Sequence, residues 1–257
     1  MNTLTQQLKQ WVKPYTPAWL MRYHHNRIIR KDGARYQGKT LREVFSNVYE
    51  TRAWGVAENP SEFYSGSSSH DTEIVDTYVK AVTDYLKSMP YRPDVVDLGC
   101  GDFNVGKRIR SLCGRYNACD VVEAVVQSNH VKFASLDVDF RCVDITCEPL
   151  PPGDVVFLRQ VLDHLDNARI AQVLARLTPY KVLIVTEYAP LKPGFQPNVD
   201  KPIGSALRIW GATPSAVVVT APPFGLKTLS MRILCEVKDS VGVIRTTAYE
   251  LAPANHG

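Results

Sequence analysis

One stretch decides the fold of this 257-residue chain: Asp94-Val-Val-Asp-Leu-Gly-Cys-Gly-Asp-Phe-Asn-Val-Gly106. Its short apolar run predicts a buried strand of a parallel sheet. Glycines follow at once, and apolar residues then recur at helical spacing from Val105 to Cys113. Gly114 is expected as the left-handed residue that ends this helix. The stretch therefore predicts a strand, a tight glycine turn and a helix.

The acidic residues around the turn indicate what it binds. Gly99 and Gly101 carry no Cβ and let a ligand approach the backbone, while the helix start offers unpaired N–H groups. A dinucleotide site has the spacing Gly-x-Gly-x-x-Gly, whereas Asp102 and Phe103 stand here where a pyrophosphate needs room. Asp97 adds a second carboxylate. This charge favours S-adenosylmethionine (SAM), which has an amino group, a sulfonium cation and no phosphate. A purely structural glycine turn is the alternative.

Several further segments have the pattern of strands, and some of them end in an acidic residue. They cover Tyr116–Asp120, Val138–Asp144, a segment from Asp154 that runs into a helix by Leu165, Lys181–Tyr188, Leu229–Val237 and Val243–Leu251. The last two are expected to form an antiparallel pair. The carboxyl ends of parallel strands share one edge of a sheet, so the polar residues there are expected to line a ligand site.

The remaining patterns predict helices and one long loop. Helical spacing over Glu43–Glu50 and 74–86 predicts two amphipathic helices, and Asp166 is expected to cap another. Residues 189–214 contain five prolines and predict a long ordered loop. Ser215–Phe224 begins like a strand and breaks at a double proline.

In their order, these motifs resemble the class I SAM-dependent methyltransferases over about residues 45 to 250. The resemblance implies an α/β fold with a doubly wound, mostly parallel seven-stranded sheet of order 3-2-1-4-5-7-6, the last strand antiparallel, and a helical N-terminal appendage. It implies SAM as the cofactor, with its ribose on Asp120 and its adenine near Asp144 and Ile145. The expected cofactor-binding residues are Trp54, Tyr64, Ser65, Gly66, Asp97, Gly99, Cys100, Gly101, Asp102, Asp120, Val121, Asp144, Ile145, Arg159 and Gln160.

A polar loop ahead of the first sheet helix carries a finer resemblance. Trp54-Gly, then Ser65-Gly-x-x-Ser, then the Gly-Cys-Gly-Asp-Phe-Asn turn is similar to a poorly characterised bacterial group of methyltransferases. Members of that group commonly lie among genes for surface polysaccharides or secondary metabolites. Their loop is usually Ser-Gly-x-Gly-Ser, whereas here Ser67–Ser69 follows Gly66. The loop is expected to close over the methionine end of the cofactor.

The basic N-terminal segment is expected to form an appendage, residues 1–42, ahead of a SAM-binding domain, residues 43–257. It carries nine Lys and Arg residues against Asp32 alone, interleaved with aromatic residues. Two short helices around Pro14 and Pro17 and a turn at Lys31–Ala34 are expected. The segment could be a solvated face packed on the domain, or it could contact an anionic acceptor or a membrane surface. RNA binding has no supporting motif.

The composition indicates a soluble protein without a metal or disulfide framework. No apolar run approaches the roughly 20 residues of a membrane span, and the first residues do not form a signal peptide. The six cysteines show no Cys-x-x-Cys pair and are expected to be reduced, which predicts a cytoplasmic location. No metal site is expected, because no spacing marks a ligand set.

The candidate catalytic residues follow the fourth and fifth strands. His164 suits proton removal near neutral pH, with Glu187 or Tyr188 as its partner. The alternative is a histidine that only walls the pocket. The predicted function is SAM-dependent O-methylation of a small-molecule or glycan-type acceptor. N-methylation of a small molecule or RNA and non-catalytic SAM binding remain alternative functions. Nucleic acid is not the expected partner, and a homodimer is left open as the assembly.

Overall fold

The computed structural model describes residues 18–239 and 242–252, which form a seven-stranded sheet of order β3-β2-β1-β4-β5-β7-β6. Neighbouring strands from β3 to β5 pair in parallel, and β7 is antiparallel to both β5 and β6. The strands are β1 (Val95–Leu98), β2 (Tyr116–Asp120), β3 (Asp139–Cys142), β4 (Val155–Arg159), β5 (Val182–Pro190), β6 (Thr228–Lys238) and β7 (Gly242–Leu251). The predicted α/β fold and strand order are confirmed.

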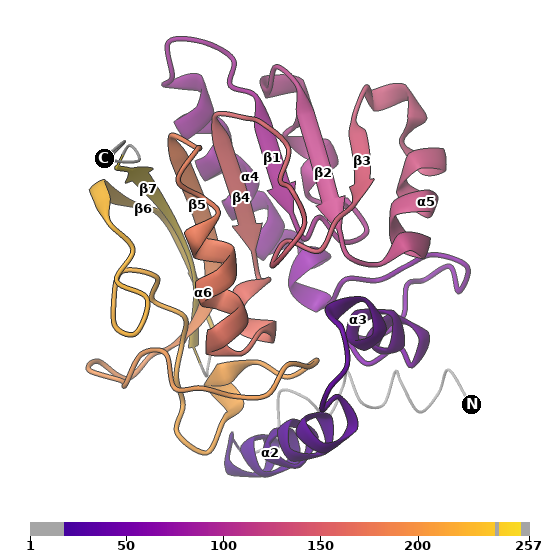
Figure 1. Ribbon diagram of the computed structural model, residues 1–257, viewed down its shortest axis with the longest axis vertical. Coiled ribbons are helices and arrows are strands. Elements are labelled where there is room, and N and C mark those ends of the chain that lie inside the picture. Colours follow the sequence, from indigo (N-terminus) through magenta and orange to yellow (C-terminus); the bar gives the residue numbers. More distant parts are fainter. Residues whose placement is uncertain (1–17, 240–241, 253–257) are drawn as a thin grey trace.

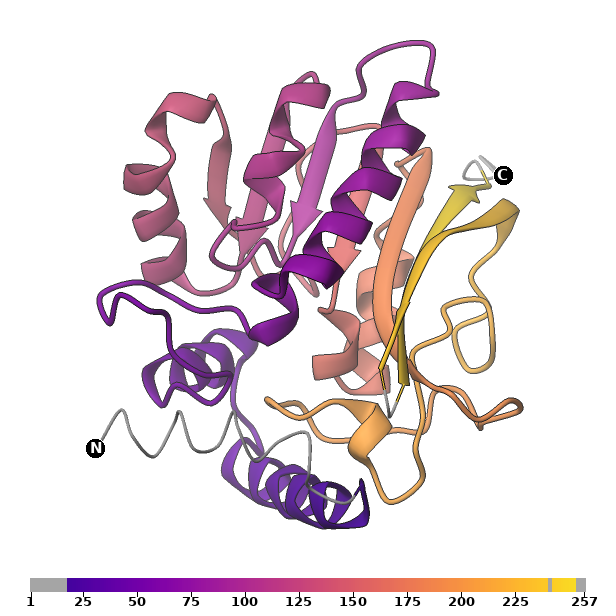
Figure 2. The same ribbon diagram turned by 180° about the vertical axis from the view of Figure 1, so that it is seen from behind.

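Helices cover both faces of the sheet and its carboxyl edge (Figure 1). Helix α6 lies in front of the sheet in Figure 1, and α4 crosses the opposite face in Figure 2. The α-helices are α2 (Ala18–Arg35), α3 (Leu41–Glu50), α4 (Thr72–Lys87), α5 (Glu123–Lys132) and α6 (Asn167–Ala175). Short 3-10 turns are η2 (Ser67–Ser69), η3 (Gly106–Arg108), η4 (Arg110–Leu112), η5 (Ala134–Leu136), η6 (Leu162–His164) and η7 (Arg208–Trp210).

Local capping fixes where the helices begin. Thr40 and Glu43 form a reciprocal capping box at the start of α3. Asp71 caps α4, and Asp166 caps α6 as predicted, each through a backbone N–H three residues on. Because α3 begins at Leu41, the predicted domain boundary after residue 42 falls within its first turn, and the division stays a prediction.

The α-helix predicted after the glycine turn does not form, and 3-10 turns take its place. The segment forms two 3-10 turns, η3 and η4, although Val105, Ile109 and Cys113 are buried as their spacing required. Gly114 is outside the left-handed region. The Arg110 guanidinium donates to the Cys113 and Gly114 carbonyls, so these groups need no left-handed cap.

Two other local predictions are also wrong. Lys31–Ala34 continues α2, and Gly33 packs against Pro202, where a Cβ would lie 2.9 Å from Pro202 Cγ. Residues 215–224 contain no strand, because the Asn198 side chain accepts from Val218 N and donates to nearby carbonyls, taking the place of strand pairing. Two short helices were expected around Pro14 and Pro17; residues 1–17 lie outside the described residues, and the described part that follows is the single helix α2 from Ala18. In the described ranges, no helix combines the length and hydropathy that a membrane crossing needs.

Candidate functional site

A cavity of about 870 Å³ opens at the carboxyl edge of the parallel strands. Figures 1 and 2 show α2, α3 and the segment around η7 gathered at that edge. The predicted site residues that line the cavity are Trp54, Ser65, Gly66, Asp97, Gly99, Cys100, Gly101, Asp102, Asp120, Val121, Ile145, Arg159, Gln160, His164 and Tyr188. Of the predicted set, Tyr64, Asp144 and Glu187 are not among the described lining residues.

The serine loop is clamped onto the end of β4. Arg159 donates from Nη1 to Ser69 Oγ (3.0 Å) and from Nη2 to the Ser68 carbonyl (2.7 Å). Gln160 hydrogen-bonds the Ser68 hydroxyl, and Asn104 Nδ2 donates to the Ser69 carbonyl (2.8 Å). The loop is therefore held at the cavity, and its closure over the cofactor stays a prediction.

Asp102 joins the glycine turn to the start of this loop. Its Oδ2 accepts from Ser65 N (2.9 Å) and lies 2.7 Å from His70 Nε2, while Ser65 Oγ accepts from Asp102 N (2.7 Å). Burial raises the pKa of Asp102, but the hydrogen bonds from His70 and Ser65 outweigh burial and hold this pKa below its ordinary value. The Tyr64 ring stacks on His70 with centroids 4.4 Å apart.

The two glycines of the turn have no room for a side chain, because neighbouring protein atoms lie too close. Gly99 has φ 81° and Gly101 has φ 55°. A Cβ would lie 2.4 Å from Val161 Cγ2 at Gly99 and 2.4 Å from Ser65 Oγ at Gly101. The absence of Cβ atoms thus first serves the packing of the turn against the β4 end and the serine loop.

Two buried carboxylates flank the turn. Asp97 accepts from the Tyr116 hydroxyl (2.9 Å), and burial raises its pKa to about 6. Asp120 accepts from the backbone N–H groups of Gly101 and Val122, both at 3.0 Å, and burial raises its pKa as well. A carboxylate offers about four acceptor positions. Asp120 therefore retains acceptor capacity toward the cavity.

The residues that follow β3 form an apolar part of the cavity wall. Val143 and Ile145 line the cavity. The Asp144 carboxylate instead accepts from Thr146 N (2.9 Å) and Thr146 Oγ1 (2.5 Å). Both hydrogen bonds fall on Oδ1 of Asp144, and the contacts of Asp144 and Ile145 with adenine stay predictions.

His164 presents one ring nitrogen as an acceptor. Its Nδ1 lies 3.1 Å from the Gly204 carbonyl, which only accepts, so Nδ1 carries the proton. Burial and the nearby Lys201 cation lower the His164 pKa to about 3, so the imidazole is neutral and Nε2 is unprotonated. The Trp54 ring lies 5.0 Å away between centroids.

Gly204 orients His164, whereas the sequence predicted Glu187 or Tyr188. Glu187 accepts from Leu162 N (2.9 Å), and burial raises its pKa well above the ordinary value. Tyr188 lines the cavity but donates its hydroxyl to Asp239. No local signal marked Gly204, which lies 40 residues from His164 in the chain.

Sequence reasoning also missed the wall that α2 contributes. Met21, His25 and Ile28 line the cavity from this helix, together with Trp210 of η7. The His25 and Trp210 rings stack 5.0 Å apart at 14°. The aromatic residues of the N-terminal segment were visible in the sequence, but their spacing alone could not show what they faced. Among the residues in the described ranges, no group of three or more His, Cys, Asp or Glu is arranged to hold a metal ion.

Comparison with known proteins agrees with this fold. Residues 96–179 match the family model described as "Methyltransferase domain". Among solved structures, the N-methyltransferase NodS of Bradyrhizobium japonicum, in complex with S-adenosyl-L-homocysteine, is similar with TM-score 0.55 and 10% identity over 80% of this chain and 98% of that one. A SAM-dependent methyltransferase of Leishmania major gives TM-score 0.51 and 12% identity over 70% and 74%. A search of curated proteins found no similar sequence.

The family match is to a methyltransferase domain over residues 96–179, and the two solved structures share the fold; S-adenosylmethionine (SAM) is the cofactor that the sequence resemblance implies. The cavity residues fit that molecule. Five aspartates line the cavity, and Arg159 is the one Lys or Arg among the described lining residues, which suits a ligand with sulfonium and ammonium cations. The aspartates are Asp71, Asp97, Asp102, Asp120 and Asp239.

Proposed function

We propose that the protein transfers the methyl group of SAM to a hydroxyl group of a small-molecule acceptor. The observation that carries this proposal is that His164 lines the cavity and that its Nδ1 lies 3.1 Å from the Gly204 carbonyl, which leaves Nε2 as the acceptor nitrogen. A hydroxyl must lose its proton when it is methylated, and His164 is the base in position to take it.

Each part of the cavity has a role in this reaction. SAM supplies an electrophilic methyl group on a sulfonium sulfur. Asp97 and Asp120 provide negative charge for the ammonium and the ribose hydroxyls, and Arg159 keeps the serine loop in place. His164 Nε2 accepts a hydrogen bond from the acceptor hydroxyl and so orients its oxygen lone pair.

The bond changes balance without a further reactant. The acceptor oxygen forms a bond to the methyl carbon as the carbon–sulfur bond breaks, and the hydroxyl proton passes to His164 Nε2 and then to water. A protonated ether is a far stronger acid than an imidazolium whose pKa is about 3. A weakly basic histidine can therefore still take the proton late in the transfer.

Asp120→Ala is expected to weaken SAM binding about 10- to 100-fold, since a hydrogen bond to a charged group contributes roughly 1.5–3 kcal/mol. Asp120→Asn keeps the shape but loses the charge and should also bind more weakly. Asp84→Asn, at an exposed position of α4, is the matched control. Calorimetry that finds unchanged affinity in both Asp120 variants would refute the ribose assignment, and an absence of SAM binding by the wild type would refute the proposed function.

SAM affinity is expected to fall as the pH drops through about 6. The Asp97 pKa is raised to about 6 by burial, so the carboxylate is charged above that pH and neutral below it. Loss of this charge removes attraction for the ammonium group of SAM. The dissociation constant measured between pH 5 and 8 should rise on acidification in the wild type. Asp97→Asn should have a weaker affinity with little pH dependence; an equal pH dependence in this variant would contradict the role of Asp97.

N-methylation is the second candidate, because the acid-lined cavity also suits an amine. A neutral amine attacks without first losing a proton, so it needs orientation more than a base. The two candidates therefore differ in how strongly turnover depends on His164.

A further inference from the structure

Aromatic and aliphatic side chains line the cavity around His164 and along α2 and η7. The Trp54 ring lies against the His164 ring. The Phe45 ring stacks on Trp54, with 5.9 Å between the two ring centroids. His25 and Trp210, whose rings stack on each other, also line the cavity. Met21, Ile28 and Leu207 add aliphatic side chains to the lining of the cavity. Such surfaces bind aromatic and aliphatic rings through area and stacking.

The polar groups near this wall already have partners. Trp54 Nε1 donates to the Ser205 carbonyl (3.2 Å), and Ser205 donates its N–H (3.0 Å) and its hydroxyl (3.2 Å) to Asp32. The Tyr188 hydroxyl donates to Asp239. A sugar buried here would leave several hydroxyl groups unsatisfied, and each such group is costly. His164 Nε2 can satisfy one hydroxyl.

The charge of the cavity also excludes acidic acceptors. Arg159 is engaged by the serine loop, and Lys201 donates to the Pro202 carbonyl (2.9 Å) from behind His164. The basic side chains of α2, such as Arg22 and Arg27, are exposed to solvent. No described cation is therefore available inside the cavity for a phosphate or carboxylate, while five aspartates repel such groups.

We infer that the acceptor is an uncharged, flat and mainly apolar compound with a hydroxyl on its ring, a phenol or naphthol, and not a sugar or an acidic glycan. The inference rests on the proposed function, because it names the acceptor of the same reaction. The acceptor ring lies between the Trp54 side and the His25–Trp210 side, and its hydroxyl meets His164.

Binding of 1-naphthol to the full chain saturated with S-adenosyl-L-homocysteine tests the inference. We expect 1-naphthol to bind at least about tenfold more tightly than 5-hydroxy-1-naphthoic acid, which adds one negative charge, and methyl β-D-glucopyranoside to show no binding. With SAM, mass spectrometry should find the methyl ether of naphthol. Equal or tighter binding of the acid or the glucoside would overturn the inference.

Two variants locate the site. Trp210→Ala should weaken 1-naphthol binding about tenfold or more without changing SAM affinity, and Met21→Ala should weaken it less. Trp19→Ala is the matched control, because Trp19 is 69% exposed on the same helix as Met21. Unchanged naphthol binding in both cavity variants would refute the inference. If the chain binds neither SAM nor its demethylated product, the proposed function itself fails, which is a separate outcome.

Discussion

His164→Ala is expected to lower turnover by about 10²-fold or more, within the ~10²–10⁴ range of general base catalysis, while SAM affinity stays nearly unchanged. The low end of that range is expected because burial and Lys201 make His164 a weak base, with its pKa near 3. Single-turnover measurement with SAM and a hydroxyl acceptor gives the rate of the chemical step.

The pH profile of this step should show no ionisation from His164 near neutrality. An ordinary histidine titrates near ~6.5, and this value was the expectation from the residue type alone. Because the His164 pKa is lowered to about 3, the imidazole is unprotonated at every pH above about 4. Wild type and His164→Ala should therefore have profiles of the same shape between pH 5 and 9 and differ in height.

His164→Asn is the control that separates the base from a wall. Its amide can donate to the Gly204 carbonyl, as Nδ1 does, but it has no basic nitrogen. If His164 is the base, the asparagine variant should be about as slow as the alanine variant. If His164 only shapes the pocket, asparagine should restore most of the rate. A His164→Ala protein that keeps more than a tenth of the wild-type turnover contradicts the base.

Sequence patterns predicted the parts of the site that local chemistry specifies. The apolar run at Val95–Leu98 and the glycines after it have few alternatives to a buried strand and a turn. The carboxylate at Asp120 follows from its place at the end of β2, once the strands are known to be parallel. These features depend on neighbours within a few residues.

The parts that the sequence did not predict depend on contacts between distant segments. The Gly204 carbonyl meets His164 through a proline-rich loop that Arg208 and Lys201 bind to the Leu165 and His164 carbonyls. In the same way, α2 walls the cavity because Asp32 binds Ser205, 173 residues away. Hydrophobic spacing indicates which face of a helix is buried but not which segment covers it.

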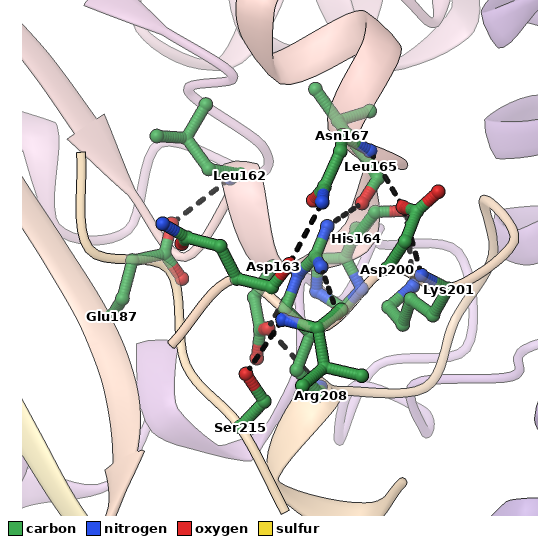
Figure 3. A network of polar contacts seen from close by, with 12 residues as sticks. Leu162, Asp163, His164, Leu165, Asn167, Glu187, Asp200, Lys201, Arg208 and Ser215 are labelled. Atoms are coloured by element: carbon green, nitrogen blue, oxygen red, sulfur yellow. Dashed lines mark hydrogen bonds and ion pairs between the residues drawn. The ribbon is translucent and has the colours of Figure 1, made fainter. Parts of the chain in front are cut away.

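The loop that holds His164 rests on a buried network of charges (Figure 3). Arg208 is 2% exposed and donates to the Leu165 and Val199 carbonyls, each at 2.5 Å. Its backbone N–H donates to Asp163 Oδ1 (3.1 Å), and its Nε lies 3.6 Å from the same oxygen. Burial raises the Asp163 pKa to about 6, opposed by the Lys201 and Arg208 cations. These contacts fix the turn on which His164 lies.

Arg208→Met is expected to lower the free energy of unfolding by about 3–5 kcal/mol, the usual effect of removing one partner of a buried ion pair. The loss should be smaller at pH 5 than at pH 7.5. Without Arg208, the Asp163 pKa rises further, so the folded protein keeps a proton that the unfolded chain releases. Stability then falls as the pH rises. Urea unfolding at the two pH values measures both effects.

Two further variants show whether the loss comes from the unpaired acid. Arg108→Met removes an exposed ion pair with Asp76 and should cost under about 1 kcal/mol. Adding Asp163→Asn to Arg208→Met removes the stranded charge and should restore part of the stability at pH 7.5, since a neutral amide costs less to bury than a carboxylate. If Arg208→Met is no less stable than Arg108→Met, or if the double variant is the least stable of all, the buried charge pair does not hold the His164 turn.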